Sequence, residues 1–158
     1  MYVISSCLIG CVVTWRGGAN YREVFANLVS RHLAVPVCPE QMGGLPTPRP
    51  PSEILGGSGE DVLAGRARVV TREGTDVTTN FLRGAEEVAR IVQLVKPELV
   101  ILKERSPSCG VRFIYDGTFS NTLRPGCGVT TALLRSLGWQ VVSDEEFIQR
   151  ATPQTQIE

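Results

Sequence analysis

The chain has 158 residues, of which 42% are hydrophobic and 20% are charged, and this balance suits one globular domain with a buried core. Its 16 basic residues equal its 16 acidic residues, and a net charge of zero argues against bulk nucleic acid or an anionic membrane as a partner. Apolar runs such as residues 99–102 are too short to cross a bilayer. The first residues show no basic leader before a long apolar stretch, so we expect no signal peptide and a cytoplasmic protein.

The first half of the chain alternates between strand and helix patterns. Residues 2–6 predict a short buried strand, and apolar residues from Tyr21 onward recur at the spacing of one helical face, with Asn20 as the N-cap. Residues 33–37 predict a second strand, which contains a proline and therefore belongs at a sheet edge or a bulge. The stretch 39–59 is dense in proline and glycine and predicts a long functional loop.

The second half continues this alternation. Residues 67–78 alternate around a Glu-Gly pair and predict a small hairpin. The elements expected after it are a helix at 80–96, a strand at 99–102, a helix opening at Gly128 and closing at Gly138, a strand at 139–142, and a short helix capped by Ser143 with Glu146.

Alternating strands and helices predict an α/β fold. We expect a single Rossmann-like domain over residues 1–152, with a mostly parallel sheet flanked by helices and a small hairpin insertion. Residues 153–158 are expected to form a flexible tail.

Five cysteines are many for a chain of this size, and their odd number in a reducing compartment argues against a disulfide framework. Cys7, Cys38 and Cys109 each lie at or just past the carboxyl end of a predicted strand. Ligands bind at this edge of a parallel sheet, where loops converge. The sequence therefore predicts that these three thiols meet. Cys11 and Cys127 have weaker claims and are expected to pack as small apolar side chains.

Three converging thiols indicate a metal centre. Structural zinc sites usually combine Cys-x-x-Cys pairs into a closed set of four ligands, and the sequence contains no such pair. The one histidine, His32, is expected to be a surface or packing residue. Thiolates also hold iron–sulfur clusters, and a cubane held by three cysteines leaves one iron without a protein ligand, as a thiophilic Lewis acid. The residues by themselves do not decide between these metals or name a reaction.

Six motifs, in this order and at these distances, resemble those of the thiouracil desulfurase (TudS) family of small bacterial iron–sulfur proteins. They are Ser-Cys-Leu-Ile-Gly at 6–10, Gly-Ala-Asn-Tyr at 18–21, Val-Cys-Pro-Glu-Gln-Met-Gly-Gly-Leu-Pro at 37–46, Pro-Arg-Pro-Pro-Ser-Glu-Ile at 48–54, Leu-Lys-Glu-Arg-Ser-Pro-Ser-Cys-Gly at 102–110 and Tyr-Asp-Gly-Thr-Phe at 115–119. Many relatives carry Cys-Arg-Tyr-Asp-Gly where this chain has Val-Thr-Trp-Arg-Gly at 13–17. That cysteine and that acid are therefore not essential here, and Trp15 keeps an aromatic face at this place.

The resemblance implies a [4Fe-4S] cluster held by Cys7, Cys38 and Cys109, with the substrate's sulfur binding at the fourth iron. The implied activity is the non-redox desulfuration of a thiolated pyrimidine, thiouracil or 4-thio-UMP, to the oxo-pyrimidine with release of sulfide. Two alternatives stay open: a desulfidase acting on thiouridine in tRNA, and a non-enzymatic zinc or iron–sulfur binding module. The preference between 2-thio and 4-thio substrates and the oligomeric state are not predicted.

Polar residues near the cysteines are the candidates for catalysis and substrate binding. Glu40 is the candidate general base that activates a water, and Ser106 and Ser108 are candidate donors to the adduct or to the cluster sulfurs. Each has an ordinary loop or turn role as its alternative. The substrate-binding candidates are Lys103 and Arg49 for a phosphate or base oxygen, Asn20 and Tyr21 as pocket lining, and Gly128 and Thr130 at the start of a helix whose free N–H groups suit an anion.

Overall fold

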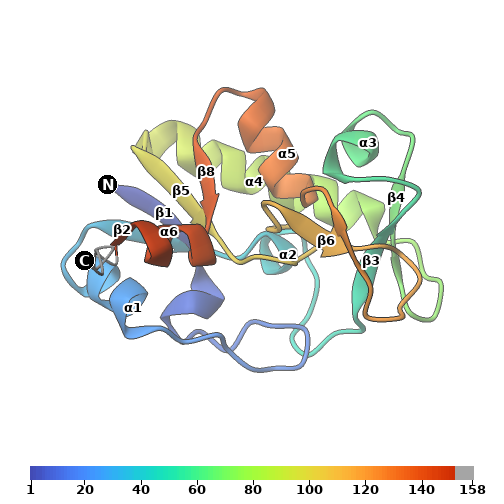
Figure 1. Cartoon of the computed structure of the whole chain (residues 1–158), viewed down its shortest axis with the longest axis horizontal. Coiled ribbons are helices and arrows are strands. Elements are labelled where there is room, and N and C mark those ends of the chain that lie inside the picture. The colour runs from blue at the N-terminus through green and yellow to red at the C-terminus, as the bar shows by residue number, and fades with distance from the viewer. Residues whose placement is uncertain (152–158) are drawn as a thin grey trace, which may run out of the picture.

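Four short strands pair in parallel at the centre of the computed structural model, which describes residues 1–151 (Figure 1). Their order in the sheet is β2-β1-β5-β8. The strands are β1 (Tyr2–Ser5), β2 (Ala34–Val37), β5 (Leu99–Leu102) and β8 (Val141–Ser143). The expected strands at 2–6, 33–37, 99–102 and 139–142 are therefore confirmed, and β2 lies at an edge of the sheet as its proline requires.

Helices cover both faces of this sheet because neighbouring residues of each strand point to opposite faces. Val3 and Val100 pack in one apolar cluster with α4 (Thr78–Val95) and α5 (Val129–Ser136). Ile4 and Ile101 pack in another with α1 (Glu23–Ser30) and α6 (Asp144–Ala151). Figure 1 shows the two pairs of helices on opposite sides of the strands. The expected α/β fold with a parallel sheet flanked by helices is confirmed.

The caps of two helices test the sequence predictions directly. The expected capping box is present at α6, where the Glu146 N–H donates to Ser143 Oγ at 3.0 Å and the Ser143 N–H donates to Glu146 Oε2 at 2.9 Å. The prediction of Asn20 as the N-cap of the first helix was wrong. That helix begins at Glu23, with Arg22 at the cap.

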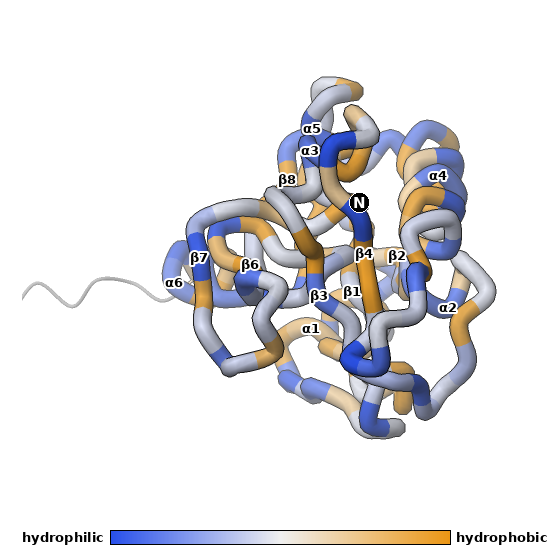
Figure 2. Tube along the Cα trace, turned by 90° about the vertical axis from the view of Figure 1, so that its right-hand side faces the viewer, coloured by the Kyte–Doolittle hydropathy of each residue, from blue (hydrophilic) through white to orange (hydrophobic). Residues whose placement is uncertain are grey.

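Two small antiparallel sheets lie beside the parallel one, and Figure 2 shows them next to each other. One pairs β3 (Ser52–Leu55) with β4 (Arg68–Thr71), and the other pairs β6 (Phe113–Tyr115) with β7 (Leu123–Pro125). Between β3 and β4 runs α3 (Gly59–Leu63). A second core, formed by residues such as Ile54, Val69, Phe81, Ile114 and Val129, joins these sheets to α4 and α5.

The expected hairpin at 67–78 needs correction. Its first half is β4, but the partner of β4 is β3, and only one isolated bridge, Val70 to Asp76, spans the Glu-Gly turn. The segment 39–59, expected to be a loop, contains β3 and also α2 (Pro39–Met42). The expected tail at 153–158 lies outside the described residues. No helix within residues 1–151 is both long and apolar enough to cross a membrane.

The strand order creates a topological switch beside β1. From β1 the chain passes to β2 on one side, and it later returns to β5 on the other side. In open α/β sheets a crevice forms outside the carboxyl ends of the strands at such a point, because successive connections lead away from each other. Cys7 lies just past β1 in a 3-10 helix, η1 (Ser6–Ile9), Cys38 directly follows β2, and Cys109 lies in the loop after β5. The fold therefore brings all three to this crevice.

Candidate metal centre and catalytic site

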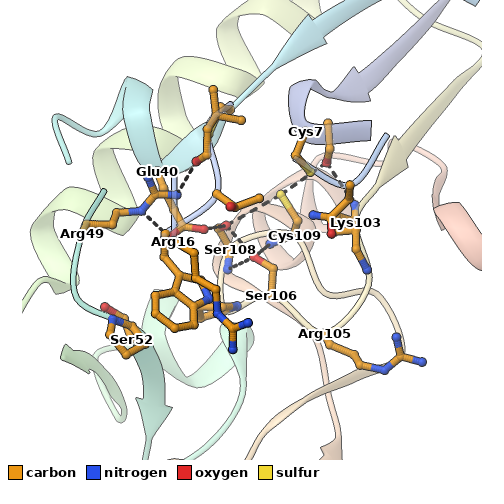
Figure 3. Close-up of a pocket in the computed structure, with 18 of the residues that line it drawn as sticks. Cys7, Arg16, Glu40, Arg49, Ser52, Lys103, Arg105, Ser106, Ser108 and Cys109 are labelled. Atoms are coloured by element: carbon orange, nitrogen blue, oxygen red, sulfur yellow. Dashed lines mark hydrogen bonds and ion pairs between the residues drawn. The ribbon is translucent and has the colours of Figure 1, made fainter. Parts of the chain in front are cut away.

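A cavity of about 1040 Å³ opens at the carboxyl ends of β1, β2 and β5 (Figure 3). Its walls include all three cysteines predicted to meet, Cys7, Cys38 and Cys109. The other sequence-predicted residues that line it are Asn20, Glu40, Arg49, Lys103, Ser106 and Ser108. Most of the predicted site is therefore gathered at one place from segments that lie up to a hundred positions apart in the chain.

Hydroxyl and amide groups surround the sulfur atoms. Ser5 Oγ donates to Cys109 Sγ at 3.6 Å, and Ser108 Oγ lies 3.7 Å from the same sulfur. The Asn20 side chain forms a hydrogen bond with Cys7, and Cys38 receives backbone N–H groups at the start of α2. Donors aimed at sulfur stabilise a thiolate, and hydrogen bonds to the sulfurs are a feature of protein iron–sulfur sites.

Burial dominates the acid–base behaviour of these thiols. It raises the pKa of Cys7 and of Cys38, and it raises the pKa of Cys109 to about 12. The Asn20 contact and the Lys103 ammonium act in the opposite direction on the pKa of Cys7. Thiolates in such a place need a bound cation, because the metal's charge replaces the protons that burial otherwise retains.

The donor set at the cavity bears on which metal group fits. Among residues 1–151 no three cysteine, histidine or carboxylate side chains converge as the ligands of one metal ion would. Two buried thiols and one half-buried thiol, with polar donors around the sulfurs and on the wall of a cavity of this size, fit a [4Fe-4S] cluster.

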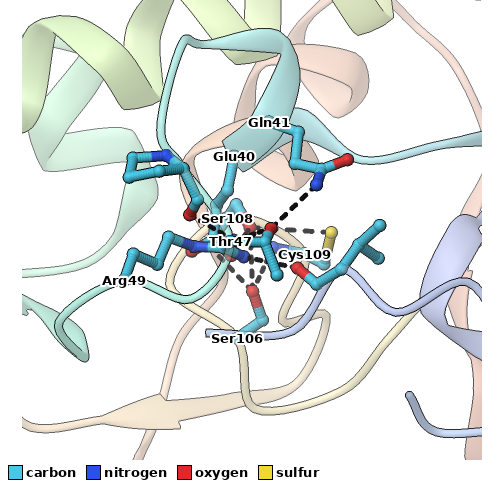
Figure 4. Close-up of polar contacts among 9 residues, drawn as sticks. Glu40, Gln41, Thr47, Arg49, Ser106, Ser108 and Cys109 are labelled. Atoms are coloured by element: carbon cyan, nitrogen blue, oxygen red, sulfur yellow. Dashed lines mark hydrogen bonds and ion pairs between the residues drawn. The ribbon is translucent and has the colours of Figure 1, made fainter. Parts of the chain in front are cut away.

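Glu40 lies in the first turn of α2, two residues after Cys38, and its carboxylate is held from two sides (Figure 4). Oε1 accepts from Arg49 Nε at 3.1 Å, and Oε2 accepts from Ser108 Oγ at 2.9 Å. The side chain is 16% exposed. Each oxygen has a second lone pair, so the carboxylate can still accept a proton from a water in the cavity.

The two serines form a directed chain of hydrogen bonds toward Glu40. A carboxylate only accepts, so the Ser108 hydroxyl hydrogen points to Glu40, and in the 2.9 Å contact between the serines Ser106 must be the donor. Ser106 Oγ also accepts the backbone N–H groups of Ser108 and Cys109, both at 3.1 Å. In this arrangement the two serines orient Glu40 and the Cys109 loop. They could donate to the substrate only if these hydrogen bonds rearranged.

Arg49 is buried, and its guanidinium ties the proline-rich loop to Glu40. Besides its ion pair with Glu40, it donates to Thr47 Oγ1 at 3.1 Å and to the carbonyls of Pro46 at 3.2 Å and Val13 at 2.9 Å. Four of the five guanidinium N–H groups are used in these contacts. Arg49 therefore acts first as a positioning residue for Glu40, and one N–H group is left for a substrate oxygen.

Lys103 places a positive charge beside the thiols. Its Nζ lies 3.8 Å from Asp144 Oδ2 and donates to the Glu104 carbonyl at 3.3 Å. Asp144 is 4% exposed and also accepts the Glu104 N–H at 2.8 Å. The ammonium is thus held at the cavity wall by the start of α6, close enough to Cys7 to oppose part of the rise that burial causes in the pKa of that thiol.

Three of the predicted substrate-binding residues do not line the cavity. Gly128 and Thr130 were expected to offer free N–H groups, and this was wrong. The Gly128 N–H donates to Gly110 O at 2.8 Å, and the Thr130 N–H donates to Ser108 O at 2.9 Å. The start of α5 therefore supports the Cys109 loop from behind. Tyr21 is 59% exposed, and its ring packs over Gly10.

Three residues that the sequence analysis passed over help to build the site. Ser5 contacts Cys109 and accepts the backbone N–H of Lys103 at 3.0 Å. Asp144 accepts the backbone N–H of Glu104, and this contact holds the start of the loop that carries Cys109. Glu104 lies within the 102–110 motif, and this position could have marked it as a residue of the site. Nothing in the local sequence marks Ser5 or Asp144, because their partners are distant in the chain.

The other two cysteines stay outside the cavity. Cys127 is 2% exposed, and its thiol donates to Glu60 Oε1 at 3.2 Å. Burial, together with Glu60, raises the pKa of Cys127 to about 11. Cys11 is half-buried.

The fold and the site together define a class: a Rossmann-like α/β protein with three cysteines and a carboxylate at the switch point of its sheet. A model of the 2-thiouracil desulfurase family matches residues 2–146. The chain belongs to the 2-thiouracil desulfurase family. It is 47% identical over 147 residues to the protein YbbK of Bacillus subtilis (strain 168), covering 93% of this chain and 97% of that protein. A solved structure of the [4Fe-4S]-dependent thiouracil desulfidase TudS superposes with a TM-score of 0.82 at 39% identity, covering 95% of this chain and 94% of that one.

Proposed function

We propose that this protein is a [4Fe-4S]-dependent desulfurase that converts a thiolated pyrimidine, thiouracil or 4-thio-UMP, into the oxo-pyrimidine and sulfide. One observation carries the proposal: cysteines from the ends of three neighbouring strands line a single cavity together with a held carboxylate. Membership in the 2-thiouracil desulfurase family and the likeness to TudS support the cofactor and the substrate class.

The reaction replaces a C=S bond by a C=O bond, consumes one water and releases one H₂S, so no net electrons are transferred. Cys7, Cys38 and Cys109 would hold the [4Fe-4S] cluster, which would supply a Lewis acid with affinity for sulfur. The protein's own residues must therefore bind the pyrimidine and move protons.

Glu40 is the general base in this proposal. Its carboxylate takes a proton from the water that adds to the thiocarbonyl carbon and passes it to the departing sulfur. The second proton of the water leaves the adduct's hydroxyl as the C=O bond forms, and its transfer to the sulfur completes H₂S. Arg49 and Ser108 fix its two oxygens, so the base is oriented before substrate arrives. Ser106 continues this chain to the backbone of Cys109, which couples the position of the base to that of a cluster ligand.

The rival functions differ in partner or in chemistry. A tRNA desulfidase would need a surface that attracts a polyanion, and the formal net charge of zero does not favour one. A zinc or cluster-carrier module would need no base, yet Glu40 is built into a hydrogen-bonded chain beside the thiols. A small thiopyrimidine is therefore the substrate in this proposal, and the cytoplasm is its expected compartment.

Anaerobic reconstitution with iron and sulfide, followed by assay of sulfide from 2-thiouracil, 4-thiouridine and 4-thio-UMP, tests the proposal. Cys109→Ala is expected to lose both iron and activity. Cys127→Ala, which changes an equally buried cysteine outside the cavity, is the matched control and is expected to keep both. The proposed enzyme activity would be refuted if the protein bound only zinc, or if it bound the cluster and released no sulfide from any of these thiopyrimidines.

Glu40→Gln separates catalysis from cofactor binding. The amide keeps the shape and the Ser108 contact but cannot take a proton, so we expect normal iron content and a fall in kcat of about 100-fold or more. Normal turnover by this variant would contradict the assignment of the base while leaving the cluster site intact.

A further inference from the structure

Glu53 in the motif 48–54 and the turn formed by the motif 115–119 have no part in the chemistry above, and the structure brings them together. Glu53 lies in β3, and the motif 115–119 runs from the end of β6 into the turn that follows it. Glu53 is 9% exposed, and its Oε1 accepts the backbone N–H groups of Gly117 at 2.9 Å and of Phe119 at 3.2 Å. A buried carboxylate from one motif therefore binds the backbone of the other, 64 and 66 positions away in the chain.

The turn held by Glu53 is in an unusual conformation. Phe119 has a φ of 55° and Asn121 a φ of 60°, in the left-handed region that side chains other than glycine rarely adopt. Gly117 has a φ of 92°, and a Cβ there would lie 2.7 Å from the Ile54 carbonyl oxygen. Strained backbone of this kind persists where surrounding contacts impose it, and it clusters at ligand sites.

The result of this strain is the position of Phe119. Its half-buried ring is part of the cavity wall, and Arg72 Cζ lies 5.9 Å from the ring centroid. Figures 1 and 2 show the turn between β6 and β7 beside β3 and β4, in the part of the molecule next to the sheet's carboxyl edge. In a wall that also carries many charged and hydroxyl groups, a flat aromatic surface suits a planar heteroaromatic ring.

Trp15 is another aromatic residue of the cavity wall, and it is less suited to this task. It is 37% exposed, and the Arg16 guanidinium lies 4.7 Å from its ring centroid. The backbone carbonyl of Trp15 accepts the backbone N–H of Arg49 at 2.9 Å, which is a structural role that any residue can fill.

We propose that Phe119 is the specificity-determining residue that stacks on the pyrimidine ring of the substrate, and that Glu53 is the positioning residue that holds it there. This inference rests on the function proposed above. It assigns recognition of the ring to the turn 116–122 and leaves the C–S chemistry to the cysteine side of the cavity.

The experiment measures, under anaerobic conditions on the cluster-loaded protein, the Kd for the product uracil by calorimetry and the KM and kcat for thiouracil. Phe119→Leu keeps an apolar side chain and removes the aromatic face. We expect Kd and KM to rise about 5- to 150-fold, the range of one lost base–aromatic stack, with kcat and iron content little changed. Phe119→Tyr is expected to restore binding. The matched control is Phe113→Leu, an exposed phenylalanine of the same hairpin that does not line the cavity.

Glu53 is tested through its coupling to Phe119. Glu53→Gln keeps one acceptor oxygen and the fold, and we expect a smaller rise in Kd than for Phe119→Leu. Adding Glu53→Gln to Phe119→Leu should raise Kd no further, because a positioning residue loses its effect once the residue it positions is gone. If the two substitutions raise Kd by factors that multiply in the double variant, this role for Glu53 is refuted. The role of Phe119 is decided separately, by comparing Kd for Phe119→Tyr with Kd for Phe119→Leu.

The outcomes separate this inference from the function on which it rests. Wild-type Kd and KM in Phe119→Leu, with sulfide still released, overturn the inference and leave the function standing. A rise in Kd for Trp15→Leu but not for Phe119→Leu also overturns it. If the wild-type protein neither binds uracil nor releases sulfide from a thiopyrimidine, the function fails, and the inference fails with it.

Discussion

Glu104→Gln tests whether a single buried carboxylate folds the loop that carries Cys109. Glu104 is 3% exposed. Its Oε1 accepts four backbone N–H groups at 2.8 to 3.2 Å, those of Arg105, Val111, Arg112 and Phe113. One oxygen has two lone pairs, so these contacts amount to about two full hydrogen bonds. A bond to a charged acceptor contributes about 1 kcal/mol more than a neutral one. The neutral amide should therefore lower the free energy of unfolding by about 2 kcal/mol.

The pH dependence of this loss has a definite sign. Burial alone raises the pKa of Glu104, but the backbone N–H groups outweigh burial, and the pKa is lowered. A carboxyl whose pKa falls on folding adds stability above its unfolded pKa of about 4.3 and loses that contribution as the pH falls through the folded value. The gap between wild type and Glu104→Gln should therefore be full at pH 7 and should narrow below about pH 4.

Thermal unfolding followed by circular dichroism measures this gap. For a chain of this length 2 kcal/mol corresponds to a fall in Tm of about 4 to 8 °C. The matched control is Glu73→Gln, which changes an exposed carboxylate in the turn after β4 and should leave Tm within about 1 °C. A wild-type Tm for Glu104→Gln at pH 7, or a gap that stays constant in acid, would refute the reasoning.

The remaining predictions concern the start of α5. Thr130 Oγ1 is buried without a hydrogen-bond partner in the described part of the chain, so Thr130→Val should raise the free energy of unfolding by about 1 kcal/mol and leave KM unchanged. A raised KM would contradict this account and would support the anion-binding site that the sequence predicted at the start of α5. A Cβ at Gly128 would lie 2.4 Å from the Ser108 carbonyl, so Gly128→Ala should displace the Cys109 loop and lower the iron content of reconstituted protein. Gly138→Ala, where nothing lies within 4 Å of a Cβ, should cost stability only; equal iron content in the two variants would count against this account.

The central strands and the meeting of the cysteines were predictable because they depend on local patterns and one general rule. Short apolar runs mark β1 and β5, and the residues that follow parallel strands share one edge of the sheet. This rule predicted that Cys7, Cys38 and Cys109 meet, without any knowledge of their contacts, and all three line a single cavity. The capping box at α6 was predictable for the same reason, since both of its residues lie within one turn.

The small sheets and the hydrogen-bond assignments were not predictable in this way. β4 pairs with β3, more than ten residues earlier, rather than with the strand-like segment just after the turn. The pattern of glycine and threonine at the start of α5 suggested free N–H groups, but carbonyls of the Cys109 loop accept them. Which acceptor lies opposite a donor depends on a distant segment, and no local pattern records it.

What the sequence determined by itself was therefore the alternation of strands and helices and the edge at which the thiols meet, because periodicity and chain order fix both. Only the tertiary structure decided that Arg49 and Ser108 hold Glu40, that Glu104 folds the Cys109 loop, and that Glu53 holds Phe119 in the cavity wall. Each of these contacts involves a carboxylate that is buried or half-buried, and its partners come from distant positions or from the turns of a folded loop. Their positions follow from packing, since a carboxylate removed from water must find donors wherever the fold supplies them.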